Sequence, residues 1–234
     1  MSTRLSNTLT IGGNTVTNIV SKTVQLDIAS TGRAKFEVVA EQEPSGLVEL
    51  HLGYTLDNMI PYFLGVIESK HQANGRWYLT CRELLGALSF PAPLTIRHAT
   101  IKAVLDELVK LGVEFVTPES AEYLTKITPA FYHCGTGIEA LRQIGKVWGI
   151  SDFIFQQRPD GKIFVGSWHD SRWPLAAIND FPEHTITAKS STTGELIAIP
   201  KLRPGIQING RHITETTLIN DRMHIRWSNK PLNA

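Results

Sequence analysis

The chain has 234 residues, of which 42% are hydrophobic and 19% are charged. This length suffices for one large domain or two to three small ones without disulfides or metal ions, and the composition excludes a disordered chain or a long coiled coil. The 23 Lys and Arg residues nearly cancel the 22 Asp and Glu residues, so the net charge of +1 gives no general attraction to nucleic acid.

Apolar and polar residues alternate from the beginning of the chain to about Leu88, which is typical of strands with one buried face. The dipeptides Gly12-Gly13 and Asn74-Gly75 tolerate positive φ angles and predict two tight hairpins. Six or so short antiparallel strands with one apolar face must close on themselves or pack on another layer. The pattern therefore predicts a small barrel or sandwich.

The first helix is predicted after Pro91 and Pro93, two prolines that mark the end of the strand region. Thr100 is a suitable N-cap, and apolar residues then recur at helical spacing on one face. Gly112 predicts the end of this helix, because glycine readily adopts the left-handed conformation that follows a last helical turn.

A second helix is predicted to begin at Thr136, which forms a Thr-x-x-Glu capping box with Glu139, and to end at Gly149. The apolar runs at residues 153–155 and 162–165 flank an Arg-Pro-Asp-Gly turn signal and predict a hairpin. The middle of the chain is therefore predicted to be a compact α+β module.

Alternation returns at about Phe181 and continues to the last predicted strand, residues 222–227. One face of that strand consists of Met223, Ile225 and Trp227, and the other of Arg222, His224 and Arg226. Strands, then helices with a hairpin, then strands again indicate that the chain leaves a β-domain, builds an insert and returns to β-structure.

Residues 136–150 form a predicted helix that ends in glycine and leads directly into a hairpin whose second strand begins Asp-Gly-Lys at residue 160. This order resembles the tail hub proteins of bacteriophages, a family that includes late control proteins and the spike proteins of type VI secretion. Residues 31–38 look like the first hub barrel and residues 64–67 like the strand that crosses it. Residues 202–209 are similar to the segment that opens the last strands of the second hub barrel.

The resemblance implies a mainly β fold with an α+β insert and two small antiparallel β-barrel-like domains of the phage tail hub type. Residues 1–90 would form the first barrel domain. Residues 91–175 would form the insert of two helices and a hairpin, and residues 176–234 the C-terminal strands of the second barrel domain.

The resemblance also implies a structural virion protein of the tail tip or baseplate, with no catalytic, cofactor-binding or metal site. Three chains would form a homotrimeric ring in which six barrels imitate sixfold symmetry, so that the ring adapts a sixfold tail tube to a threefold spike. The expected partners are tail tube or distal tail ring proteins, a trimeric spike or fibre protein and, as a further option, a tape-measure protein. DNA would pass through the channel without specific binding.

Cys134 supports an alternative, a cell-wall cysteine peptidase or hydrolase. It lies two residues before the Thr136 cap, where a helix N-terminus can stabilise a thiolate, and His133 is its neighbour. The residues around Cys134 lack the Asp-Cys-Ser/Gly context of the NlpC/P60 peptidases, and sequence neighbours rarely form a nucleophile–base pair. A buried structural cysteine is the favoured interpretation.

Trp168 and Trp173 support a third hypothesis, a wall-carbohydrate binding module in which the two rings stack on sugars. Because they lie where the insert rejoins the β-region, packing or an inter-domain hinge is favoured. No spacing of histidines or carboxylates predicts a zinc site or an acid–base pair.

The basic row Arg222, His224 and Arg226 is the candidate interface of the sequence. A solvated strand face is the simpler interpretation. The functional one is contact with an acidic patch of a neighbouring subunit, because a strand that also joins a ring needs specificity on its outer face.

The sequence also predicts the cellular compartment. Cys81 and Cys134 are too few for the disulfide framework of a small secreted domain, and both thiols are expected to be reduced. No segment approaches the ~20 apolar residues of a membrane span, and the first residues lack an apolar run of signal-peptide length. We expect synthesis in a host bacterial cytoplasm and no membrane anchor.

Overall fold

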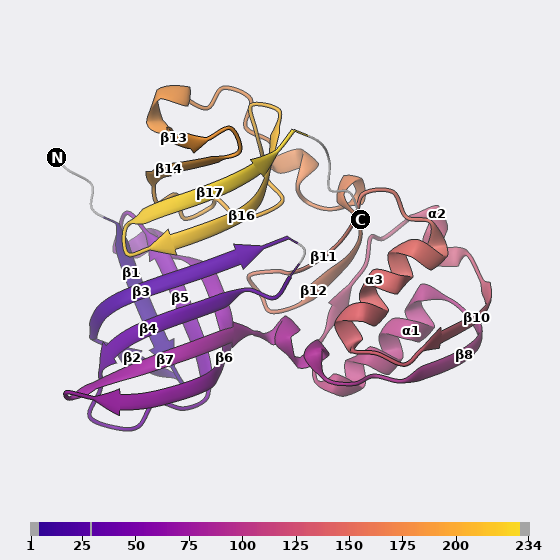
Figure 1. The fold of residues 1–234 in the computed structure, drawn as a ribbon, viewed down its shortest axis with the longest axis horizontal. Helices are drawn as coiled ribbons and strands as arrows, with labels where there is room; N and C mark the ends of the chain where they lie inside the picture. Colours follow the sequence, from indigo (N-terminus) through magenta and orange to yellow (C-terminus); the bar gives the residue numbers. More distant parts are fainter. Residues whose placement is uncertain (1–4, 29, 230–234) are drawn as a thin grey trace.

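A computed structural model describes residues 5–28 and 30–229. Figure 1 shows two regions side by side. One is a large curved sheet built from both ends of the chain, and the other is a smaller region of helices and short strands from its middle. Among the described residues, no helix is both long and apolar enough to cross a membrane.

The N-terminal half of the large sheet has seven strands in this order along the chain. They are β1 (Ser6–Ile11), β2 (Asn14–Val16), β3 (Asn18–Asp27), β4 (Arg33–Val39), β5 (Leu47–Gly53), β6 (Ile60–Ala73) and β7 (Arg76–Glu83). The predicted hairpins are confirmed: Gly12 and Gly13 join β1 to β2, Asn74 and Gly75 join β6 to β7, and all four have positive φ angles.

The C-terminal half of the sheet has five strands. They are β13 (Thr187–Ser190), β14 (Thr193–Ile197), β15 (Gln207–Ile208), β16 (Arg211–Ile219) and β17 (Arg222–Ser228). The two halves join where β16 pairs antiparallel with β3, with Glu215 opposite Asp27 and Ile219 opposite Thr23. The strand order is β13-β14-β17-β16-β3-β4-β7-β6-β5-β1-β2, with β15 on β16.

The mainly β fold is confirmed, but the two predicted barrel-like domains are not closed barrels among the described residues, because their strands join in one sheet with β13 and β2 at its free ends. The physical reason lies in the core. A single cluster of buried apolar side chains contains Leu26 and Phe36 from the N-terminal strands and Leu218 and Ile225 from the C-terminal strands. The C-terminal strands therefore bury their apolar face together with the N-terminal ones.

The middle region contains all three α-helices of the described residues and five short strands. They are β8 (Leu94–Ala99), α1 (Ile101–Leu108), β9 (Phe115–Val116), α2 (Glu122–Thr125), β10 (Thr128–His133), α3 (Gly137–Trp148), β11 (Phe153–Gln157) and β12 (Ile163–Ser167). The hairpin β11–β12 is confirmed, whereas the β8–β10 pair, the short α2 and the parallel pairing of β9 with β12 were not predicted.

Both predicted helices begin as expected. Thr100 Oγ1 accepts a hydrogen bond from Ala103 N at 3.2 Å, and Thr136 and Glu139 form the complete capping box. The helix α1 gives way to a 3-10 turn before Gly112, which ends it with φ +87°. The apolar faces of α1 and α3 meet in a second core, separate from the first, whose fully buried members lie between residues 85 and 165.

Candidate functional site

The face of β17 that carries the candidate interface residues is exposed as predicted. Met223, Ile225 and Trp227 are buried in the sheet core, and the remaining side chains alternate with them on the outer face. Arg222 and Arg226 are exposed, and His224 is half-buried. The strand therefore presents its basic row to the outside of the curved sheet.

Acidic residues of the neighbouring strands lie beside this basic row. Glu195 of β14 is directly opposite His224, and Arg226 Nε lies 3.7 Å from Glu215 Oε2 of β16. The pKa of Glu195 lies below its ordinary value, because Lys189 donates a hydrogen bond to it and His224 and Arg222 add smaller electrostatic contributions. The outer face therefore has mixed charges, and part of the basic row is already neutralised within the chain.

Two exposed isoleucines that lie outside the predicted interface extend this face. Ile197 of β14 and Ile219 of β16 both lie opposite Arg222, one on each side of β17. Their exposed fractions are 61% and 41%. We call the set formed by Arg222, His224, Arg226, Ile197 and Ile219 the β17 face. The two isoleucines add apolar area beside the exposed charges, and protein interfaces combine an apolar centre with a polar rim.

The surroundings of Cys134 do not support a cysteine hydrolase. Cys134 is exposed, so the expectation that it is a buried structural cysteine is wrong. Both ring nitrogens of His133 contact oxygen atoms of the chain. Nδ1 lies 2.9 Å from Gln143 Oε1, and Nε2 lies 2.8 Å from the Thr136 carbonyl oxygen. A base that activates a thiol must direct one ring nitrogen at the sulfur. Both nitrogens of His133 are engaged elsewhere.

The two thiols differ strongly in accessibility, which predicts their reactivity. We expect Cys134 to react with Ellman's reagent in the folded chain. Cys81 is fully buried, and this burial raises the pKa of its thiol to about 12, so it should react only after unfolding in urea. Cys134→Ser should abolish the fast reaction, and Cys81→Ser should leave it intact. Fast reaction of both thiols in the native chain would contradict this burial.

Trp168 and Trp173 do not form a sugar-stacking platform, because both rings are buried, with exposed fractions of 6% and 4%. The Nε1 of Trp168 donates to the Gly205 carbonyl oxygen at 2.8 Å, and that of Trp173 donates to Gln156 Oε1 at 3.1 Å. The favoured prediction of a packing role is confirmed. The rings tie the middle region to residues 202–206, which we call the junction segment.

A buried ion pair also holds the junction segment. Arg203 Nη2 lies 3.6 Å from Glu83 Oε1, and Arg203 Nη1 donates to the carbonyl oxygen of Tyr62. The Gly32 N–H donates to Glu83 Oε2 at 2.8 Å. Loss of hydration raises the pKa of Glu83 to about 7, although Arg203 and Gly32 act in the opposite direction. The alternation of apolar and polar residues could not predict this ion pair, because Glu83 and Arg203 lie far apart in the sequence.

The described residues contain no group of three or more His, Cys, Asp or Glu side chains that could hold a metal ion.

A phage protein is similar to the chain in sequence. No family model matches the chain. The "uncharacterized 58.7 kDa protein in lys 3'region" of Haemophilus phage HP1 (strain HP1c1) is 29% identical over 204 residues, which are 87% of this chain and 38% of that protein. The chain thus spans less than half the length of this curated relative.

Solved structures resemble the chain over almost its full length. A tail protein from Neisseria meningitidis MC58 has a TM-score of 0.65 at 11% identity and covers 96% of each chain. The 43 kDa tail protein of prophage MuSo2 from Shewanella oneidensis has a TM-score of 0.67 at 9% identity, covering 95% of this chain and 98% of the other. The E. coli type VI secretion component c3393 is described as similar to the T4 tail proteins gp27 and gp5. It has a TM-score of 0.62 at 11% identity, and the match covers 96% of this chain and 77% of that one. These identities show a shared fold.

Proposed function

This chain has the fold of phage tail proteins, and from that premise we propose that it is a structural subunit of a phage or phage-like tail rather than an enzyme. The observation that supports this most strongly is the extent of the likeness. It includes the joined sheet as well as the middle region, and it covers almost all of two tail proteins. The similarity in sequence to a protein of Haemophilus phage HP1 also supports a phage origin.

We further propose the specific role of a hub at the tail tip or baseplate. In this role three chains form a homotrimeric ring that adapts a sixfold tail tube to a threefold spike or fibre protein and lines the DNA channel. The joined sheet supports this role through its two halves, one from each end of the chain, because three such chains supply six β-surfaces to a ring. Tail tube, distal tail ring and tape-measure proteins are the further proposed partners, and DNA passes without specific binding.

A mass measurement tests the ring. Multi-angle light scattering should give three times the chain mass of 26.0 kDa, and negative-stain images should show a ring. A chain that stays monomeric at all accessible concentrations, or a stable sixfold ring, would contradict the trimer.

The β17 face is the proposed contact between neighbouring subunits. We expect the double substitution Arg222→Glu and Arg226→Glu to weaken self-association at least roughly tenfold, because it reverses two exposed charges on that face. The monomer should lose little stability, since exposed ion pairs contribute less than about 1 kcal/mol each. Sedimentation velocity measures the association, and urea unfolding measures the stability.

A matched control is available on the middle region. Lys102→Glu and Lys110→Glu reverse two exposed lysines in and just after α1. These changes alter the net charge by the same amount and should leave self-association unchanged. Equal effects of the two double substitutions would show that net charge, rather than the β17 face, controls assembly.

A further inference from the structure

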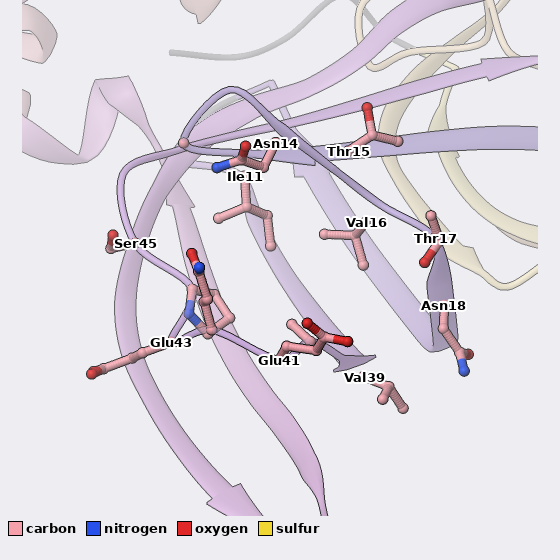
Figure 2. Close-up of a pocket in the computed structure, with 14 residues that line it drawn as sticks. Ile11, Asn14, Thr15, Val16, Thr17, Asn18, Val39, Glu41, Glu43 and Ser45 are labelled. Carbon is pink, nitrogen blue, oxygen red and sulfur yellow. The ribbon is translucent and has the colours of Figure 1, made fainter.

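A groove of about 610 Å³ opens at the free edge of the sheet formed by β2 (Figure 2). It lies between residues 14–18, which contain β2 and the turn into β3, and residues 39–45, which lead from β4 toward β5. The strands β2 and β3 follow each other in the chain but do not pair. The groove therefore occupies the place at which the curved sheet stays open.

The backbone of β2 offers hydrogen-bonding groups to this groove. In an antiparallel pair every second residue directs its N–H and C=O away from its partner strand. Ile11 and Asn14 close the Gly12-Gly13 turn, so Thr15 is the residue of β2 whose backbone groups face outward. Among the described residues, β2 has no strand on that side. An added strand would pair there.

The wall of the groove is fixed before anything binds. Gly12 N–H donates to the Leu47 carbonyl oxygen at 2.8 Å, and a Cβ on Gly12 would lie 2.4 Å from the Ser45 carbonyl oxygen. Lys70 Nζ donates to the Pro44 carbonyl oxygen at 2.8 Å and pairs with Glu43 at 2.9 Å. A preformed site avoids the cost of ordering a loop on binding.

The side chains of the groove select the chemistry of its occupant. Ile11 and Val16 point into the space, and Val39, which is 40% exposed, lies across from them with Glu41 (Figure 2). Glu41 is exposed and has no ion pair within residues 5–28 and 30–229, in contrast to Glu43. The groove thus combines an apolar floor with an unpaired negative charge.

We propose that this groove binds an extended segment of a partner protein, which adds a strand to β2, places an apolar side chain on Val16 and Val39, and places a lysine or arginine beside Glu41. Strand addition supplies affinity through the backbone, and alternate side chains supply specificity. The inference goes beyond the hub role and does not depend on it.

A second copy of the chain fits this groove less well than a partner protein. The free strand at the opposite end of the sheet is β13, whose four side chains, Thr187, Ala188, Lys189 and Ser190, include no large apolar one. Its lysine already pairs with Glu195 at 3.1 Å. The strand therefore lacks the large apolar side chain that the groove selects, and its one lysine is already paired within the chain.

Fluorescence anisotropy with two labelled peptides tests the charge requirement. The first repeats Ser-Val-Ser-Lys twice, and the second has glutamate in place of lysine. The lysine peptide should bind at least roughly tenfold more tightly to the natural chain, and Glu41→Lys should reverse this preference. Glu119→Lys, an exposed change on the middle region, should leave the preference unchanged. An unchanged preference in Glu41→Lys, or no binding of the lysine peptide at millimolar concentration, would overturn the proposal.

A second pair of variants tests the strand edge. Thr15→Pro removes the outward N–H and should weaken lysine-peptide binding roughly tenfold, whereas Thr15→Val keeps that N–H and should bind normally. Circular dichroism checks that both variants fold, and Glu41→Lys remains informative if the proline variant does not. Equal binding by the two variants overturns strand addition.

Dissociation of a self-assembled ring by Thr15→Pro would identify a second copy as the occupant, which also overturns the proposal. Peptide binding by a monomeric chain would leave the groove proposal standing while the hub role fails.

Discussion

Replacing Arg203 by methionine should lower the free energy of unfolding by about 3 to 5 kcal/mol at pH 8, because buried Glu83 loses its ionic partner and must then either stay charged without one or bind a proton at a pH that disfavours it. Urea unfolding followed by tryptophan fluorescence measures the loss. The double variant Arg203→Met with Glu83→Gln leaves no unpaired charge and should be markedly more stable than Arg203→Met alone. If the single variant is no less stable than the double one, the pair does not hold the junction segment.

The same pair predicts a pH dependence of stability. The pKa of Glu83 is raised from 4.5 to about 7 in the folded chain. Between these two values the folded state keeps a proton that the unfolded state has lost, so the free energy of unfolding should fall as the pH rises through this window. Glutamine does not titrate in this range, so Glu83→Gln should remove this part of the dependence of the unfolding free energy on pH. An equal slope in both chains would show that Glu83 ionises normally.

The second large effect is expected at Gly205, the residue of the junction segment that lies against Trp173. A Cβ there would lie 2.3 Å from Trp173 Nε1, and the φ angle of +102° disfavours any other residue. The indole is buried and bonded to Gln156, so it has little room to move. Gly205→Ala should therefore cost about 2 to 5 kcal/mol, from backbone strain and overpacking together.

Gly210→Ala is the matched control for this substitution. Gly210 also has a positive φ angle, +78°, but nothing lies within 4 Å of its Cβ position. Its cost should be limited to backbone strain of about 1 to 2 kcal/mol. Urea unfolding compares the two variants. A Gly205→Ala chain as stable as Gly210→Ala would mean that Trp173 repacks freely.

The parts of the fold that local chemistry controls could be predicted from the sequence. The Thr136 cap, the Gly149 stop and the hairpin turns depend on residues a few positions apart, and all are present. The alternation of β17 likewise placed Trp227 in the core. Such features follow from backbone and side-chain preferences that hold wherever the segment lies.

The features that depend on distant partners could not be predicted. Alternation shows that β3 and β16 are strands, but not that they pair, so two barrels were expected where one sheet exists. A packing role of Trp168 was expected, but its hydrogen-bond partner, the Gly205 carbonyl oxygen, could not be read from the local sequence. The acidic neighbours of the β17 face, Glu195 and Glu215, also depended on strand order.

The pairing of β3 with β16 has a consequence for the order in which the molecule is made. One edge of β3 stays unpaired until residues 211–219 have left the ribosome, because β16 is its partner strand there. The buried residues of the second core all lie between residues 85 and 165, so this core can pack earlier. An unprotected edge of this length invites pairing with another nascent chain. Interrupted synthesis just before β16 should therefore yield an aggregating product in which the middle helices are already folded.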